Sequence, residues 1–433
     1  MPRRTLWWLR RLSAVVVSLC ALAGAVRLVV PASAAVDDEP PGVLRQLAFI
    51  RSALDDGAGD EAQRQFPEGY FFLHALYGLS WVEAGMREPP AERSRALREA
   101  RWALDRLDSP SGRAPFAADL VPSYGVFYRG WSNWLRGGVL SLQPDGRRDP
   151  AELRRFVSDS AALGAAFDAS ESPFLTAYPG QAWPVDSTVA IASLRLHDTL
   201  LPARYADTVE RWLRGARERL DPRTGLLPHR ADPDTGAPAE VARGTSQSII
   251  QRFLVDIDPE FAEEQYLRFR ERYVVFPLAL GPAVREYPEG VDGPADVDSG
   301  PLPLGVSLSA SVVTLGAARV HGDAALAGAL ASFSEVAGLP LDTPWTKRYA
   351  FGLLPIGDAF LAWSKTARPW AAETPSTPPS DISWWWRAPL LSILAVLGLV
   401  PWLPALVRRL RRAVSRRRRT GGRVPLPRGL PDA

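Results

Sequence analysis

Carboxylates, aromatic rings and a few basic side chains gather in five segments of the sequence that are rich in glycine and proline. The segments are FPEGYFFLH (66–74), VPSYGVFYRGW (121–131), YPGQAWPVDS (178–187), TGLLPHRADPDTGAPAEVARGTSQS (224–248) and REYPEGVDGPADVDSG (285–300). A sugar ring has one apolar face and a rim of hydroxyls, so aromatic faces beside carboxylates suit carbohydrate binding. The segments therefore predict a carbohydrate site, although the same aromatic residues at helical spacing also suit a hydrophobic core.

Asp186 is the first candidate for acid–base chemistry, because it follows Trp183 at the start of an apolar helical segment. Burial at that position raises the pKa of a carboxyl group and lets it donate a proton near neutral pH. The helix N-terminus opposes this shift by favouring the charged form. The alternative prediction is structural, since aspartate before a helical run is also a preferred N-cap residue.

Ordinary glycoside hydrolysis needs two carboxylates that flank the scissile bond. We predict Asp298 and Glu68 as catalytic partners of Asp186, although Asp298 with Ser299 could instead cap the helix that follows. Other carboxylates in the same segments are Glu286, Glu289 and Asp296. Further side chains of these segments are predicted to bind substrate, namely His74, Tyr124, Tyr128, Arg285 and Glu286.

Other chemistries have less support in the sequence. An EF-hand loop counted from Asp296 or Asp232 lacks its final glutamate, because Ser307 or Arg243 stands there. There is no H-E-x-x-H zinc motif, no Walker or dinucleotide-binding loop, and no G-x-S-x-G elbow. We expect neither a metal nor a cofactor, and only a looser calcium site stays open.

The elements that position these segments are predicted to be helices. Apolar residues recur at helical spacing, and amphipathic charged segments alternate with mostly apolar ones. This alternation predicts an all-α outer domain over residues 35–366, arranged as an (α/α)6 toroid whose inner helices start at a central cavity; a helical solenoid is the alternative. The predicted helical segments are 42–55, 68–85, 91–107, 123–141, 149–167, 184–199, 202–219, 244–256, 258–272, 299–320, 323–337 and 349–366.

A family resemblance covers residues 183–244. Trp183-Pro-Val-Asp186-Ser-Thr is followed by Asp221-Pro-Arg-Thr-Gly-Leu-Leu-Pro-His229, by Asp232-Pro-Asp-Thr-Gly236 and by Arg243-Gly244. This order resembles the unsaturated glucuronyl and rhamnogalacturonyl hydrolases, which are six-hairpin (α/α)6 enzymes. The chain departs from their pattern in the proline after Trp183, in the lack of a methionine after Asp186, and in Val241-Ala242 before Arg243.

The resemblance implies roles for four residues. Asp186 protonates the enol-ether double bond of an unsaturated uronic acid and activates the water that adds to it. Trp183, which covers Asp186, contributes to substrate binding, and His229 and Arg243 hold the substrate carboxylate. Linalool dehydratase-isomerase is similar at the level of the (α/α)6 ring, and that alternative implies an isoprenoid or lipid-derived substrate.

The N-terminal segment has the features of a signal peptide. Arginines in Met1–Leu12 precede an apolar stretch, Ser13–Val26, and Ala32-Ser33-Ala34 has the form of a cleavage site. Residues 1–34 are therefore predicted to be removed; the alternative is an uncleaved membrane segment that leaves both termini in the cytoplasm. Cys20 is the only cysteine of the chain, so the mature domain is expected to contain no disulfide, as is common in a bacterial, for example actinobacterial, envelope.

The C-terminal segment predicts a membrane span. Residues 367–383 are rich in proline and are expected to form a stalk. Three tryptophans and an uncharged run then form a transmembrane helix over 384–407, and the arginine-rich tail 408–433 is expected in the cytoplasm. The tail could bind anionic lipid.

The charge distribution argues against a nucleic-acid partner. The formal net charge is +3, but its basic excess lies at the two termini, and residues 35–386 hold more acidic than basic residues. The sequence thus predicts a single-pass membrane protein whose extracytoplasmic domain acts on a carbohydrate or another small molecule. A non-catalytic envelope protein that binds glycan or a partner, and an enzyme acting on isoprenoid-type substrates, are the alternatives.

Overall fold

The structure is a computed structural model that describes residues 3–30, 37–38, 40–375 and 377–420 of the chain. It is mostly helical and divides into two compact units. One unit is the outer domain, Val30–Trp386, and the other comprises Met1–Val29 together with Arg387–Ala433.

Six mostly apolar helices of the outer domain contact one another in sequence. Each contacts the next along the chain, and the last also contacts the first. These inner helices are α4 (Gly69–Arg87), α7 (Gly125–Ser141), α9 (Pro184–Leu200), α11 (Gly244–Leu254), α13 (Leu308–Val320) and α15 (Pro355–Thr366).

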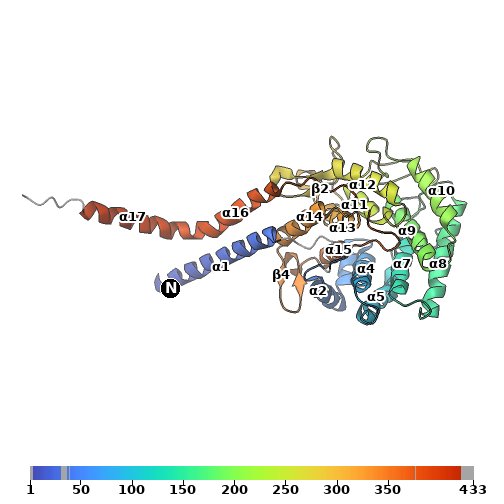
Figure 1. Ribbon diagram of the computed structural model, residues 1–433, viewed down its shortest axis with the longest axis horizontal. Helices are drawn as coiled ribbons and strands as arrows, with labels where there is room; N and C mark the ends of the chain where they lie inside the picture. The colour runs from blue at the N-terminus through green and yellow to red at the C-terminus, as the bar shows by residue number, and fades with distance from the viewer. Residues whose placement is uncertain (1–2, 31–36, 39, 376, 421–433) are drawn as a thin grey trace, which may run out of the picture. The chain divides into compact units, whose positions relative to one another are not determined.

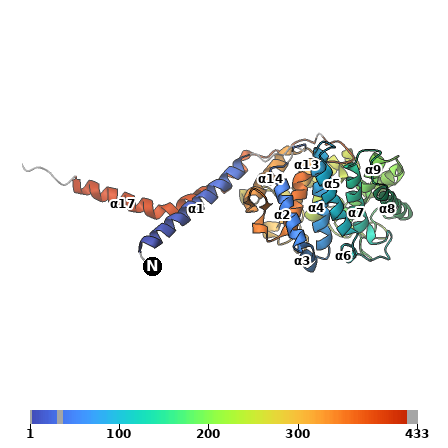
Figure 2. The same cartoon turned by 90° about the horizontal axis from the view of Figure 1, so that it is seen from below.

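Six further helices pack on this set from outside. Figure 1 shows α5, α8 and α10 lying outside α4, α7 and α9, and Figure 2 shows α2, α4, α5 and α7 running side by side. The outer helices are α2 (Val43–Asp55), α5 (Ser94–Leu107), α8 (Pro150–Ala169), α10 (Ala206–Arg217), α12 (Pro259–Tyr273) and α14 (Ala324–Ala337).

Side-chain character explains which helices lie inside. Helix α10 buries only one face, through Val209, Trp212 and Ala216, and exposes its arginines and acids, as an amphipathic surface helix does. Helix α7 is buried over most of its length, and a Cβ atom at Gly130 would lie 3.0 Å from Ala190 of α9. The small residue therefore lets two inner helices approach closely.

Aromatic residues fill the space among the inner helices. The ring of Trp131 lies 5.4 Å from Phe253, 5.7 Å from Trp363 and 5.4 Å from Phe72, measured between ring centroids. These side chains come from four different inner helices, so they belong to one hydrophobic core.

The outer domain was predicted to be all-α, but it also contains short strands. β1 (Val274–Val275), β2 (Ala283–Arg285) and β3 (Val306–Ser307) form an antiparallel sheet in that order, with Val284 opposite both Val274 and Ser307. β4 (Leu341–Asp342) pairs with β5 (Lys347–Arg348).

Each of the twelve segments predicted from periodicity contains a helix, and α13 and α15 show the largest delays relative to the predicted starts. α13 starts at Leu308 rather than near residue 299, and α15 starts at Pro355 rather than near residue 349. Pro301 and Pro303 lack the backbone N–H that a helix interior needs, and Pro355 suits a first helical position. Two short helices, α3 (Ala58–Gln65) and α6 (Pro110–Arg113), were not predicted.

The proline-rich segment after α15 differs from the expected stalk. The ring of Trp370 stacks on that of Trp134 with centroids 4.4 Å apart, and the backbone N–H of Trp370 donates to Asp256 Oδ1 at 2.7 Å. Further along, the Ser380 N–H donates to Asp323 Oδ1 at 3.0 Å. These contacts hold the segment along the surface of the outer domain.

The second unit contains two apolar helices. Trp7–Val29, within α1 (Arg3–Val29), and Trp384–Arg411 are long and apolar enough to cross a membrane. The second stretch includes α16 (Ala388–Leu399), a 3-10 turn at Val400–Trp402 and the start of α17 (Leu403–Thr420). The predicted cleavage motif Ala32-Ser33-Ala34 and the tail beyond Thr420 lie outside the described residues.

Candidate functional site

The loops before four inner helices meet at one end of the outer domain. The hydroxyl of Tyr178, before α9, donates to the carboxylate of Glu68, the residue that precedes α4. The N–H of Val126, in the first turn of α7, donates to Thr176 O at 3.0 Å. The N–H of Gly244, at the start of α11, donates to Glu286 O at 2.8 Å. Segments that are far apart in the sequence thus converge.

Three carboxylates interact electrostatically: Glu68 before α4, Asp186 in the first turn of α9, and Asp298 in the loop before β3. Asp186 is only 4% exposed, and its pKa is raised well above the usual aspartate value. Burial is the largest cause, and the charges of Glu68 and Asp298 add to it. The indole of Trp131 acts in the opposite direction, although its Nε1 forms no hydrogen bond of regular geometry with a described residue. The three predicted catalytic residues therefore lie within range of one another's charges.

The N-cap alternative for Asp186 does not match the structure. Helix α9 begins at Pro184, and its N-cap residue is Trp183, so Asp186 lies within the first turn. No side-chain hydrogen bond caps this helix. The carboxyl group of Asp186 is thus buried without the capping bonds that would stabilise its charged form.

Asp298 occupies a different environment. Its side chain reaches solvent, but the surrounding protein limits its hydration, and its pKa is raised to about 6. Burial is the largest cause, followed by the charges of Asp296 and Glu68, whereas Arg243 opposes the shift. Asp298 and Ser299 do not cap α13, since Ser307 is the N-cap residue and accepts from Ala310 N–H at 3.2 Å.

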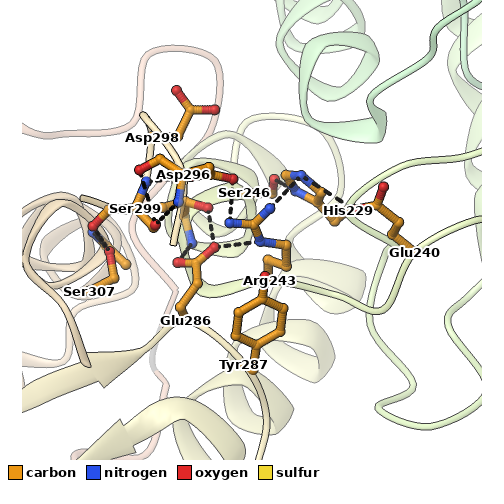
Figure 3. Close-up of polar contacts among 12 residues, drawn as sticks. His229, Glu240, Arg243, Ser246, Glu286, Tyr287, Asp296, Asp298, Ser299 and Ser307 are labelled. Carbon is orange, nitrogen blue, oxygen red and sulfur yellow. Dashed lines mark hydrogen bonds and ion pairs between the residues drawn. The ribbon is translucent and has the colours of Figure 1, made fainter. Parts of the chain in front are cut away.

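Arg243 is the centre of a second group of polar side chains (Figure 3). Its Nε donates to Glu286 Oε1 at 2.7 Å, and its Nη2 lies 2.6 Å from Asp296 Oδ2. Its Nη1 lies 3.4 Å from His229 Nε2, and its guanidinium lies 5.2 Å from the ring centroid of Tyr287. We call Arg243, His229, Glu286 and Asp296 the Arg243 cluster.

The backbone explains how the Arg243 cluster is held. Arg243 is the extended N-cap residue of α11, next to Gly244. A Cβ atom at Gly244 would lie 2.1 Å from the carbonyl oxygen of Arg285, so only glycine allows α11 to start against β2. Thr245 Oγ1 also donates to Glu286 Oε1 at 2.8 Å, which anchors the buried glutamate from the same turn.

His229 is held in its neutral form. Burial, and after it the charge of Arg243, lowers the pKa of His229 to about 3. Nε2 faces an Arg243 N–H, so Nδ1 carries the proton and donates to Ser246 Oγ at 2.6 Å. In this arrangement His229 accepts from Arg243 and orients the guanidinium.

The two groups are connected through the loop before β3. Asp296 pairs with Arg243, and its charge raises the pKa of the neighbouring Asp298. Figure 3 shows the Asp298 carboxylate pointing away from the Arg243 cluster. One loop therefore contributes a carboxylate to each group.

Other predicted binding residues lie apart from these groups. The ring of His74 is tilted against that of Tyr70, with centroids 4.2 Å apart, and burial lowers the pKa of His74 to about 4. The hydroxyl of Tyr128 donates to Asp108 Oδ1 at 3.1 Å and accepts from Arg113. Both side chains are buried in helix contacts, so the structure does not place these two residues with the carboxylates.

The remaining predicted residues lie near the loops. Tyr124 precedes α7 in a left-handed conformation, with φ of 72°, and its ring lies 5.4 Å from that of Tyr128. Trp183 is half-buried, and its ring lies 5.5 Å from that of Tyr178. Arg285 lies in β2 beside Glu286, and its Nε has no hydrogen-bond partner among the described residues.

Sequence reasoning missed Tyr178 and Ser246 as members of these groups. Tyr178 lies in the same loop as Trp183 and Asp186, and that shared loop was the available signal. Ser246 gave no signal, because a serine in the first turn of a helix is common.

The described residues offer neither a metal site nor a large hollow at the candidate site residues. Among the described residues, no group of three or more His, Cys, Asp or Glu side chains has an arrangement that could hold a metal ion. An open hollow of about 550 Å³ lies between α2, α3 and the segment 346–355, and none of its lining residues is a predicted site residue. No protein-family model matches the chain.

Proposed function

We propose that the outer domain is an (α/α)6 toroid that acts on a carbohydrate as a hydrolase, with Asp186 as its general acid. The six inner helices support this fold, because their contacts run from α4 to α15 and return to α4. The loops that converge before α4, α7, α9 and α11 support a site at one end of such a toroid. Glycans that carry a uronic acid are the proposed substrate class.

The observation that carries the proposal is the grouping of Asp186, Glu68 and Asp298. Burial and the neighbouring carboxylates raise the pKa of Asp186 well above the usual aspartate value, which favours its protonated form. Hydrolysis of a glycosidic bond needs such a donor beside a second carboxylate that is ionised. The aromatic rings of Tyr178 and Trp183 lie next to these groups and suit the apolar face of a sugar.

The environments of the carboxylates suggest separate roles. Asp186 donates a proton to the departing oxygen, or to the double bond of an unsaturated uronide. Asp298, with a pKa of about 6, is mostly ionised at neutral pH and activates water from the solvent-exposed side. Glu68, which accepts from Tyr178, keeps the pKa of Asp186 raised.

The Arg243 cluster supports an acidic substrate. Arg243 is held by buried Glu286 on one side, whereas Asp296 on the other side is exposed to solvent. A substrate carboxylate could replace Asp296 on the guanidinium, because the arginine fork can bind a carboxylate through two parallel N–H bonds. His229 keeps that fork oriented.

The proposed location is the outer face of a cell membrane. The stretch Trp384–Arg411 is long and apolar enough to span it. The arginines that follow favour a cytoplasmic C-terminus, near which the tail could bind anionic lipid. The outer domain would then face the cell envelope.

The test is an assay of residues 37–386 against unsaturated uronides and saturated oligosaccharides. Asp186→Asn should lower turnover by about 10²–10⁴-fold while the circular dichroism spectrum stays unchanged. Asp256→Asn is the matched control. Asp256 is also buried with a pKa raised to about 7, but it lies just after the C-terminal end of α11 and should be dispensable for turnover.

Two outcomes would overturn the proposal. Turnover that is equal in wild type and Asp186→Asn would remove Asp186 from the chemistry. A folded wild type that binds oligosaccharides but converts none of them would favour a non-catalytic glycan-binding protein.

A further inference from the structure

The two apolar helices of the second unit pack against each other. The most buried residues of α1 are Ala14, Ala21 and Leu28, which recur every seven residues along one face. Residues on the opposite face, such as Leu19 and Leu22, are about 60% exposed. The buried face lies against α16 and the turn that follows it.

The contacts show that the helices run antiparallel. Arg387, at the start of α16, donates from Nε to Leu28 O at 3.1 Å. A Cβ atom at Gly24 would lie 3.2 Å from Leu394, and one at Gly398 would lie 3.4 Å from Ala21. Residues further along α16 thus contact residues nearer the start of α1.

Polar contacts join the helices where α16 is interrupted. Ser18 Oγ donates to Gly398 O at 2.8 Å, and Trp402 Nε1 donates to Ser18 Oγ at 2.9 Å. Pro401 has no N–H, and the chain forms a 3-10 turn at Val400–Trp402. Within a bilayer, backbone groups at such a break need partners from a neighbouring helix, and Ser18 supplies one.

The charge pattern agrees with this pairing. The antiparallel arrangement brings Arg10 and Arg11 to the same end of the pair as the arginines of α17. Each helix, considered separately, also predicts that its arginine-rich end is cytoplasmic. The charge distribution and the helix packing are independent properties, and both indicate that α1 and α16 cross the membrane in opposite directions.

We propose that α1 is retained in the mature protein and pairs with α16 as an antiparallel two-helix membrane hairpin. Both termini then lie in the cytoplasm, and the outer domain is joined to the membrane through both of its ends. This proposal replaces the predicted removal of residues 1–34. It does not depend on the proposed enzymatic function.

A cysteine pair tests the proposal in the full-length chain. In a Cys20→Ala background, Ala21→Cys and Gly398→Cys place their Cβ atoms 3.4 Å apart, close to the ~3.5–4.5 Å of disulfides. Leu22→Cys with Gly398→Cys is the matched control, because Leu22 lies on the exposed face of α1.

The readouts are the intact mass and an oxidation assay in membranes. The chain carries a tag at each terminus and a protease site inserted after Glu373. After mild oxidation and proteolysis, a non-reducing gel should show both tags in one band for Ala21→Cys/Gly398→Cys, at several-fold higher yield than for the control. The intact mass should include the N-terminal segment.

Three results would each overturn the hairpin. The first is an intact mass that matches a chain starting near Ala35, which would show that α1 has been removed. The second is cross-linking that is no stronger at Ala21 than at Leu22. The third is a disulfide product of twice the chain mass before proteolysis, which would assign the contact to two copies of the chain.

Discussion

Opposite ends of the inner helices bury carboxylates in two different ways. Where α4 and α9 begin, Asp186 lies near two other carboxylates, and no cation among the described residues contributes to its pKa. Where α4, α11 and α15 end, Glu83 is equally buried but pairs with Arg252 and accepts from Thr366. Arg252 also donates to Trp363 O at 2.9 Å.

The difference separates a structural carboxylate from a candidate catalytic one. A buried charge with a cation and hydrogen bonds is satisfied, and removing one partner leaves the other charge unpaired. A buried carboxyl group among other carboxylates has a raised pKa, which makes it a candidate for proton transfer. Both residues are buried, so burial alone does not distinguish them.

The largest expected effect on stability is at the paired end. Glu83→Gln leaves the Arg252 charge buried without its partner and should lower the free energy of unfolding by about 3–5 kcal/mol. The measurement is urea denaturation of residues 37–386. Glu83→Leu with Arg252→Met removes both charges and should cost much less, so an equal loss in both variants would contradict a role for the charge pair.

A backbone contact near Arg243 gives the next largest effect. The Cβ atom of Gly244→Ala would meet Arg285 O at 2.1 Å, which should force α11 away from β2 and cost about 1–3 kcal/mol. Gly357→Ala is the control, because its Cβ meets only the Leu354 side chain, at 3.4 Å. Equal melting temperatures for the two variants would show that the contact at Gly244 is relieved without cost.

A smaller effect is expected at Tyr178. Tyr178→Phe removes the hydroxyl that donates to Glu68, a loss of about 0.5–1.5 kcal/mol. Turnover on a substrate found for the wild type should fall by up to about tenfold. Tyr205→Phe serves as the control, since the Tyr205 hydroxyl has no hydrogen-bond partner among the described residues.

The smallest expected effect is a pH dependence of stability at Asp298. Its folded pKa of about 6 exceeds the unfolded value of about 3.9, so the folded state binds more protons between these values. This residue therefore lowers stability as the pH rises from about 4 to about 6, and the loss is complete above pH 6. Asp298→Asn should flatten that part of the stability curve, and an unchanged curve would mean that the folded pKa is ordinary.

Local patterns explain what the sequence predicted well. Helix periodicity is a property of neighbouring residues, and it placed segments such as 184–199 and 258–272 close to α9 and α12. Helix α13 starts later than its apolar run predicted, because prolines lie in the first part of that run. Asp186, Asp298 and Glu68 were predicted from their positions in loops before helices, and their charges influence one another in the structure.

Other features depend on residues that are distant in the sequence. The order of residues in 367–383 indicates no packing, yet Asp256 and Asp323 hold this segment on the domain. His74 and His229 both occur in the segments rich in glycine and proline. Only their neighbours in space distinguish His74, which packs against Tyr70, from His229, which orients Arg243.

The sequence by itself determined the helical character, the two apolar stretches and the loops that carry the acidic and aromatic residues. These follow from the spacing of apolar side chains and from the backbone preferences of proline and glycine. Only the tertiary structure decided which carboxylates are paired with arginine and which have other carboxylates as their nearest charges. A pKa depends on the charges and the solvent within a few ångströms, and that environment exists only once distant segments have packed together.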